Sequence, residues 1–542
     1  MEYILMSEIG KFFDSKIILV TGVTGFVGKS LVEKLLRSCP YLKKIYVLIR
    51  PSKNQTPNAR LEKLLNSHAF NVLRKMDPNF YQKISVISSE LSEDNIGLST
   101  QDMNTIINNV DIIFHSAATV RFVDTIKNLI KVNTLGTKKL FDLAKNCKKL
   151  QCFIYISTAY SNSEKKRVEE IVYPTQLDPC QIIEQVGKLT EEEMNNEELV
   201  KRIIGTSHNA YTFSKKLAEN IITSEKVKFQ IAVCRPSIVS ASYKEPVMGW
   251  VDNFNGVSGL MIAATKGFLR TVEGDVSAMA SMVPVDYTVN TCIALAWFVT
   301  VCCTSNPPRC DCKSHEAVLV VNNTVTDENK ISWGTLAEWI KIFNNEIPME
   351  DPFRRISCEF TTNKAIHKFW CFADHMIPAY LVDSVMSLTG QKSKFKVVNI
   401  YNRLHKTNRV LTPFINNQTT WATSNKVRML NKMNSIDQRI FYFDSNKIVW
   451  SSYVRNYLIG LKTYVLKEKM ENLEIAHSSV KKLKTIRYTF NTMLTICILL
   501  TCIPKEKLIE MIDSLKNPAM YQALMSVSTY QDYLFNVPSL LK

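Results

Sequence analysis

The sequence predicts an α/β fold, in which a doubly wound parallel sheet is followed by a mainly helical C-terminal domain. Two observations support this fold class. Short apolar, β-branched runs at 16–20, 44–49, 84–88, 110–118 and 151–157 alternate with helical patterns, as in β-α-β units. A glycine-rich turn joins the first of these runs to a helix. With 542 residues, the chain is too long for one compact core, so two or more domains are expected.

The glycine-rich turn, TGVTGFVGKS at 21–30, ends like a triphosphate-binding loop. That loop needs four residues between its first glycine and Gly-Lys-Ser, and the residue at the required place is Val23. The spacing Gly-x-x-Gly-x-x-Gly between an apolar strand and an amphipathic helix instead predicts a Rossmann-type dinucleotide site. The residues predicted to contact the cofactor here are Gly22, Thr24, Gly25, Phe26, Val27 and Gly28. The polar residues Lys29, Glu33, Lys34 and Arg37 are expected on the helix face opposite the apolar stripe, with Lys29 toward solvent.

The second strand, 44–49, ends in Arg50-Pro51-Ser52-Lys53. A site specific for NAD usually places an acidic residue near this strand end, where it binds the ribose hydroxyls. Arg50 and Lys53 suit a 2′-phosphate instead, so the predicted cofactor is NADPH. The alternative is a solvated basic loop.

A catalytic group is predicted from two later segments. Tyr211 and Lys215 lie four residues apart, on one face of a helix, and Tyr211 is the only one of 20 tyrosines with this spacing. A nearby ammonium and the positive ribose-nicotinamide environment are expected to lower the pKa of the phenol, which then donates a proton to an alkoxide. Thr158, or its neighbour Ser157, at a strand end would donate a second hydrogen bond to the same oxygen.

Further cofactor contacts are expected at the strand end that carries Ala117 and Ala118, where small side chains leave room for the nicotinamide ribose. Asn133, which opens the next helical region, is either a polar support for the cofactor or a helix cap.

The chain resembles the alcohol-forming fatty acyl-CoA reductases of the insect type. The matching segments include TGVTGFVGKSLVEKLLRSCP, HSAATVRF, ISTAYSN, YTFSKKLAE, CRPSIVSA and EPVMGWVDNFNGVSGLM, with a weaker match from Asp374 to Glu468. The resemblance implies an extended short-chain-reductase fold with Thr158, Tyr211 and Lys215 as the active-site trio. It also implies that Pro236, Ser237, Ile238 and Val239 line the nicotinamide end. The implied reaction is the reduction of a long-chain acyl-CoA to a primary fatty alcohol with two NADPH, through a bound aldehyde and with release of CoA. The expected organisation is a catalytic domain at 1–350, a helical domain at 351–470 and a membrane-associating tail at 471–542.

The formal net charge of +17 favours anionic partners. No segment resembles a nucleic-acid-binding module, so phosphate-bearing small molecules and an anionic membrane surface are preferred, and no nucleic acid is expected. The apolar part of 484–503 is short for a spanning helix, so spanning, interfacial lodging and packing on the C-terminal domain all stay open. The more apolar run from Val289 to Cys303 is interpreted as a core helix.

The 14 cysteines are scattered and no secretory signal is recognised, which favours a reducing, cytosol-facing location. With the family resemblance this predicts the endoplasmic reticulum membrane, with the peroxisome as the alternative. The cluster Cys302, Cys303, Cys310, Cys312 and His315 matches no common zinc spacing, and no metal is predicted.

Two other functions remain open on the residues alone. One is a sugar-nucleotide epimerase or steroid dehydrogenase, because those enzymes share the Tyr and Lys pair. The other is a catalytically inactive lipid-binding scaffold that keeps the fold.

Overall fold

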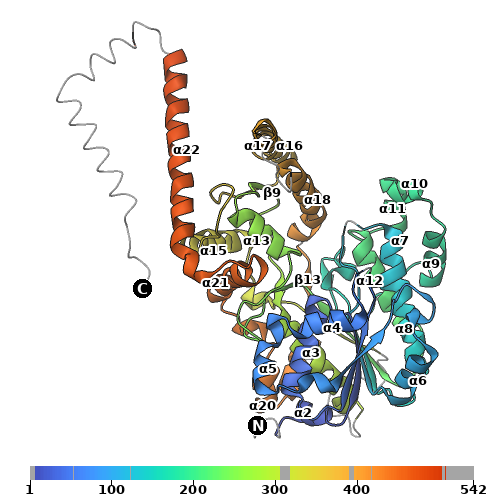
Figure 1. Cartoon of the computed structure of the whole chain (residues 1–542). Coiled ribbons are helices and arrows are strands. Elements are labelled where there is room, and N and C mark those ends of the chain that lie inside the picture. The colour runs from blue at the N-terminus through green and yellow to red at the C-terminus, as the bar shows by residue number, and fades with distance from the viewer. Residues whose placement is uncertain are drawn as a thin grey trace. The chain divides into compact units, whose positions relative to one another are not determined.

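The structure is a computed structural model that describes residues 6–52, 54–122, 124–304, 318–389, 396–416, 418–502 and 507 (Figure 1). The chain divides into two compact units, Met1–Ala476 and His477–Lys542.

The first unit is built on a seven-stranded sheet whose neighbouring strands are all parallel. The strand order is β3-β2-β1-β4-β5-β7-β11, so the chain reverses direction across the sheet between β1 and β4. In such a sheet ligands bind outside the carboxyl ends of the strands, at this switch point. The strands are β1 (Ile17–Thr21), β2 (Lys44–Ile49), β3 (Ile84–Ser88), β4 (Ile112–His115), β5 (Cys152–Ile156), β7 (Gln230–Pro236) and β11 (Val318–Asn323).

Helices cover both faces of the sheet (Figure 1). Alternate side chains of β1 divide between two cores: Ile18 and Val20 pack with residues of α3 and α14, whereas Leu19 packs with residues of α6, α8 and α12. The predicted doubly wound parallel sheet is therefore confirmed. The helices of this part are α2 (Glu8–Phe12), α3 (Phe26–Ser38), α4 (Pro57–Leu65), α5 (Asn71–Met76), α6 (Thr100–Asn109), α7 (Ile126–Leu129), α8 (Gly136–Lys145), α9 (Pro179–Gly187), α10 (Glu191–Asn195), α11 (Glu197–Ile204), α12 (Ala210–Thr223) and α14 (Val285–Trp297).

The apolar run that contains α14 is a core element, as the sequence predicts. Every residue of α14 is buried. Among the described residues, Val285–Cys302 is the one helical stretch long and apolar enough to cross a membrane, and 89% of it is buried inside the protein. Its apolar character is explained by this burial.

The rest of the first unit is mainly helical, which confirms the predicted C-terminal helical region. Two short parallel strand pairs connect the C-terminal region to earlier segments: β6 (Arg167–Val168) with β13 (Thr420–Trp421), and β9 (Thr271–Glu273) with β12 (Glu359–Thr361). A third pair, β8 (Ile238–Ser240) with β10 (Met282–Pro284), lies before this region. The helices are α13 (Val257–Thr265), α15 (Trp333–Glu346), α16 (Lys364–Trp370), α17 (Ile377–Leu388), α18 (Val397–Ile415), α19 (Ser424–Lys432), α20 (Ser435–Ile440) and α21 (Trp450–Gly460). The predicted boundaries at 350 and 470 stay predictions.

The polar face of α3 is not solvated, contrary to the simple amphipathic interpretation. Glu33 and Lys34 are 1% and 3% exposed. Arg37 pairs with Glu33 at 2.7 Å and with Glu245 at 3.2 Å, while Lys34 pairs with Glu245 at 2.6 Å. These charges are buried because the segment that carries Glu245 covers them, which the sequence of α3 alone does not reveal. Lys29, expected toward solvent, forms an ion pair with Asp252.

The described part of the second unit continues the helix α22 (Leu473–Cys502). Its apolar side chains are largely exposed, including Ile486, Tyr488, Phe490, Met493, Leu494 and Ile496. The predicted membrane segment 484–503 lies on this helix, except for Ile503, which is outside the described residues.

Candidate active site

The glycine-rich turn connects β1 to α3 at the switch point of the sheet. Gly22 has a φ of +75°, and a Cβ atom there would lie 2.6 Å from the backbone nitrogen of Ala117. A Cβ atom on Gly28 would collide with the backbone of Gly22. Gly25 is the N-cap of α3 and has no side chain that could accept a hydrogen bond from the amides of the first turn. These amides therefore need an acceptor from outside the helix. This cradle fits a pyrophosphate at a helix N-terminus, and the adjoining Thr24 is exposed at the tip of the turn.

A buried relay holds the loop after β4, which carries Ala117 and Ala118. Thr137 donates to the carbonyl of Asn133, so its hydroxyl oxygen accepts from His115 Nε2 at 2.9 Å. His115 Nδ1 then accepts from the Thr21 hydroxyl at 2.7 Å, and Thr21 Oγ1 accepts from the amide of Ala117 at 3.1 Å. Burial, with the nearby Lys215 cation, lowers the pKa of His115 to about 3, so the ring is neutral. Sequence reasoning assigned His115 no role.

Asn133 supports the site and is not a helix cap. It lies within the helical segment Ile130–Leu135, between α7 and α8. Its side chain accepts from the amide of Thr119 at 2.8 Å and donates to the Thr119 carbonyl at 3.1 Å and to Ser214 Oγ at 3.0 Å. Because Ser214 lies on α12, Asn133 joins the β4 loop to the helix that carries Tyr211. Its predicted cofactor contact stays a prediction.

Tyr211 and Lys215 lie on α12, as predicted, and both are buried. Lys215 Nζ donates to the carbonyl of Ile156 at 2.8 Å and lies 4.8 Å from the centre of the Tyr155 ring. The ring of Phe122 meets that of Tyr211 edge-on, 5.1 Å between centres.

The expected lowering of the Tyr211 pKa is wrong for the protein groups taken alone. Burial raises the pKa of the Tyr211 phenol. Burial also lowers the pKa of Lys215 to about 7, although the carboxylate of Glu219 opposes that shift. The prediction assumed a fully protonated lysine. Burial weakens the binding of the proton to Lys215, and the spacing of the two residues does not reveal this.

The two candidate hydroxyls at the end of β5 differ in their partners. Ser157 donates to Glu219 Oε1, away from Tyr211. Thr158 accepts from the amide of Tyr160 at 3.3 Å, which leaves its hydroxyl proton for another acceptor. The geometry therefore favours Thr158 over Ser157 as the second donor.

A buried ion pair below the site was missed in the sequence. Glu219 lies one turn beyond Lys215, and Arg235 binds it through two hydrogen bonds of 2.9 and 2.6 Å. The two side chains are 1% and 0% exposed. Glu219 also accepts from Ser157 and from Ser161. The pair thus fastens α12 to β7 and to the loop after β5. The Tyr-x-x-x-Lys-x-x-x-Glu spacing was the available signal, since it places all three residues on one helix face.

The predicted ends of the cofactor site lie at the ends of β2 and β7. Arg50 is exposed after β2, and Arg60 from α4 donates to its carbonyl. Burial and the neighbouring Arg50 cation lower the pKa of Arg60, so two guanidinium groups face the same region. Lys53 lies outside the described residues.

At the other end, Pro236 closes β7, and Ile238 and Val239 belong to β8. Between them, the Ser237 hydroxyl is buried without a hydrogen-bond partner in the described protein. Such an orphan polar group fits a ligand with its own donors and acceptors, as the nicotinamide carboxamide has.

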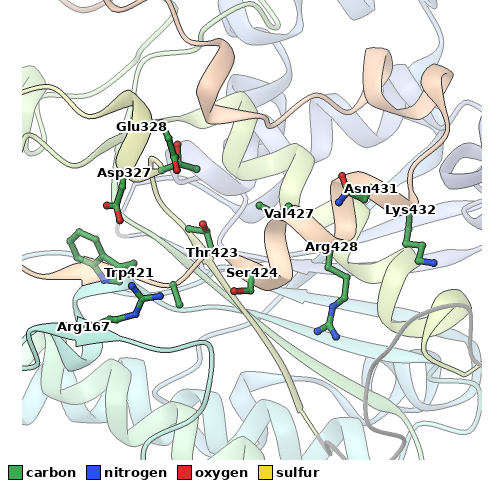
Figure 2. A pocket seen from close by; sticks show the side chains of 12 residues that line it. Arg167, Asp327, Glu328, Trp421, Thr423, Ser424, Val427, Arg428, Asn431 and Lys432 are labelled. Atoms are coloured by element: carbon green, nitrogen blue, oxygen red, sulfur yellow. The ribbon is translucent and has the colours of Figure 1, made fainter.

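A surface pocket of about 570 Å³ is not part of this site (Figure 2). Its lining carries both signs of charge: the basic residues are Arg167, Arg428 and Lys432, and the acidic residues are Asp327 and Glu328. None of the predicted catalytic or cofactor residues lines it.

A smaller cavity, of about 60 Å³, has an almost wholly apolar lining. Its lining includes Met261, Leu269, Trp333, Ala337, Ile340 and Ile415. The ring of Phe414, next to Ile415, lies 5.4 Å from that of Phe122, which meets Tyr211. Ring contacts thus link Tyr211, Phe122 and Phe414, and α18, which carries Phe414, also contributes Ile415 to the lining of this cavity.

Known proteins agree with these features. Family models described as "Male sterility protein" match residues 20–292 and 374–468. Fatty acyl-CoA reductase 1 of Xenopus laevis is 39% identical over 493 residues, which are 91% of this chain and 93% of the relative. The chain belongs to the fatty acyl-CoA reductase family. Fatty acyl-CoA reductase 2 of Bos taurus is 38% identical over 90% of this chain and 92% of its own length.

Solved structures support the fold of this family member. The terminal R domain of the myxalamid PKS-NRPS pathway superposes with a TM-score of 0.53 at 16% identity, covering 83% of this chain and 91% of that domain. The R domain of a nonribosomal peptide synthetase from Mycobacterium tuberculosis gives 0.52 at 16% identity, over 83% and 92%. At this identity the likeness concerns the fold alone.

Proposed function

We propose that the chain catalyses the NADPH-dependent reduction of a long-chain fatty acyl-CoA to a primary fatty alcohol, with release of CoA. The observation that carries this proposal is the placement of Tyr211 and Lys215 on α12, where Lys215 donates to the Ile156 carbonyl at the end of β5. The chain is 39% identical over 91% of its length to a named fatty acyl-CoA reductase. The narrower resemblance to the insect type belongs to the same proposal and rests on the sequence motifs.

NADPH is preferred to NADH because two arginines meet where a 2′-phosphate would lie. Arg50 is exposed beyond β2, and Arg60 lies against its backbone. Two guanidinium groups offer charge-assisted hydrogen bonds to a phosphate, whereas ribose hydroxyls would call for a carboxylate. When bound, NADPH supplies the hydride in each of two reductions.

The residues of the site would act on the oxygen of the reacting carbonyl. After the first hydride reaches the thioester carbon, the carbon–sulfur bond breaks, CoA leaves as its thiolate and an aldehyde remains. After the second hydride, Tyr211 donates its proton to the alkoxide and Thr158 donates a hydrogen bond to the same oxygen. Lys215 supports the positive potential around the phenol.

The aldehyde has to stay bound between the two reductions. The apolar rings of Phe122 and Phe414 near Tyr211, and the apolar cavity lined in part by Ile415, offer surfaces that an alkyl chain can contact. An aldehyde anchored by its chain would remain near Tyr211 while the cofactor is exchanged.

The membrane is part of the proposal. The exposed apolar side chains of α22 and the net charge of +17 support attachment of the tail to an anionic membrane surface that faces the cytosol. We place the protein at the endoplasmic reticulum, with the peroxisome as the alternative, and microscopy with markers for both organelles distinguishes them.

The test is an incubation of the full chain, purified or in microsomes, with NADPH and palmitoyl-CoA, with products resolved by chromatography. Fatty alcohol is expected from the wild type and not from Tyr211→Phe, whereas Tyr81→Phe, at an exposed tyrosine, serves as the matched control. No alcohol and no NADPH consumption would identify an inactive scaffold. Family membership argues against the epimerase and steroid dehydrogenase alternatives.

A further inference from the structure

One long helix consists of α16, the π-helical turn Cys371–Met376 and α17. An ordinary surface helix turns its large apolar side chains toward the core, whereas this helix exposes them to solvent. Large apolar residues recur at steps of three, four and seven residues and are all exposed. We call seven of them the outer stripe: Ile366, Phe369, Trp370, Ile377, Tyr380, Leu381 and Leu388; Phe372 and Val385 of the same helix are exposed as well. Phe369 is 60% exposed and Leu388 87%. At 1.5 Å per residue the stripe is about 33 Å long.

The opposite face of the same helix is the one attached to the protein. His367 Nδ1 lies 3.1 Å from the hydroxyl of Thr271 on β9, and His375 Nε2 accepts from the amide of Arg270 at 3.1 Å. Ala379 is fully buried, and Asp383 accepts from the first amides of α18 at 2.8 and 3.1 Å. The outward direction of the stripe is thus fixed by contacts along the helix, and α16 and α17 project from the sheet (Figure 1).

Cations lie near both halves of the stripe. Lys364 and Lys368 are exposed at its beginning, and Lys396 is exposed just before α18. The two acidic residues of the helix are engaged within the protein: Asp374 pairs with Arg270 and Arg354, each at 3.4 Å, and Asp383 caps α18. The border therefore presents positive charge without exposed acidic side chains in the helix itself.

We infer that the outer stripe lies in a membrane surface, parallel to the bilayer plane, with its lysines on anionic headgroups. A helix with an apolar face, aromatic residues and a basic border is typical of interfacial binding. Trp370 and Tyr380 have the amphipathic rings that concentrate at the headgroup level. The helix does not span the bilayer, because its inner face is held by polar contacts to β9 and α18.

A second copy of the chain is a poorer occupant. A two-fold interface would bring the same patch of both copies together. Lysines lie near both halves of the stripe, so an interface between two copies would bring positive charges together, whereas anionic lipid neutralises them. This lipid contact lies on the first unit and is independent of the proposed attachment through the tail and of the reductase activity.

The test places a photoreactive benzoylphenylalanine at Phe369 or Leu388 of the full chain. Vesicles of phosphatidylcholine and phosphatidylserine carry a labelled acyl chain, and lipid adducts are quantified after irradiation. The matched control is the same group at Tyr81, a 52% exposed aromatic residue of the first unit outside the stripe. We expect about tenfold more lipid adduct at the two stripe positions than at Tyr81, and a severalfold decrease in vesicles without phosphatidylserine.

Three results overturn the inference: equal adduct at the stripe and control positions, adducts to a second copy of the chain, or adducts to its own tail. A double substitution tests whether the adduct at position 388 depends on the other stripe residues. Phe369→Ser with Leu381→Ser should lower the lipid adduct at position 388 by about tenfold without changing circular dichroism, because two apolar anchors are lost. An unchanged yield would also overturn it. Lipid adducts in a chain that makes no alcohol would refute the proposed function alone.

Discussion

The substitution Glu219→Gln removes the charge from the buried pair beneath the active site but keeps the shape of the side chain. Arg235 would then lie in the core, 0% exposed, without its carboxylate. Breaking a buried ion pair from one side costs about 3–5 kcal/mol, because an uncompensated charge stays buried. We therefore expect the free energy of unfolding to fall by about 3–5 kcal/mol.

The matched control is Glu169→Gln. Glu169 pairs with Arg167 at 2.8 Å, but the two side chains are 48% and 58% exposed. Exposed pairs contribute about 0–1 kcal/mol. Urea unfolding of the full chain, followed by tryptophan fluorescence, measures both variants. A loss at Glu219 no larger than at Glu169 would refute the reasoning.

The same substitution should move the pH profile. The Glu219 carboxylate raises the pKa of Lys215 against the lowering by burial, which leaves it at about 7. Lys215 loses its proton as pH rises through this pKa, so activity that needs the cation falls on the alkaline side. Without the carboxylate the pKa of Lys215 drops, and the falling limb of kcat/KM moves to lower pH. If the alkaline limb of the kcat/KM profile lies at the same pH in Glu219→Gln as in the wild type, Lys215 is not the group that titrates there.

Three further variants test other parts of the site. Gly22→Ala should lower kcat/KM for NADPH by about a hundredfold, because its Cβ would lie 2.6 Å from Ala117 N. Unchanged kinetics in this variant would show that the turn does not contact the cofactor. Arg60→Ala should raise the KM for NADPH about tenfold and leave that for NADH nearly unchanged, as expected for one lost charge-assisted bond; equal effects on both cofactors would argue against a 2′-phosphate contact. Ala337→Phe, which narrows the apolar cavity, should reduce kcat/KM for palmitoyl-CoA about tenfold more than for decanoyl-CoA; an equal loss for both would place the acyl chain elsewhere.

Local patterns were sufficient for the sheet and for the common location of Tyr211 and Lys215 on one helix. Gly22, with its positive φ, and the Tyr211–Lys215 pair are recognisable because their spacing is imposed within one turn of chain or helix. The strand–helix alternation also predicted the parallel sheet, since each unit carries its own apolar periodicity.

Contacts between distant segments could not be predicted in the same way. Glu33 looks like a solvated helix residue until Glu245 and its segment cover it, and Phe414 joins Phe122 from nearly three hundred residues away in sequence. Burial raises the pKa of Tyr211 among the protein groups, and no local pattern reports that burial because it depends on packing between distant segments. Arg60 was missed for a similar reason, since α4 brings it back to Arg50.

The central claim is most directly tested by the stoichiometry of the reaction. Full-length protein is incubated with excess NADPH and palmitoyl-CoA, and NADPH oxidation, free CoA, aldehyde and alcohol are measured in the same sample. The account predicts two NADPH oxidised for each alcohol and each CoA released, with no free aldehyde at any time. One NADPH per CoA with accumulating aldehyde, or no NADPH oxidation at all, would contradict it.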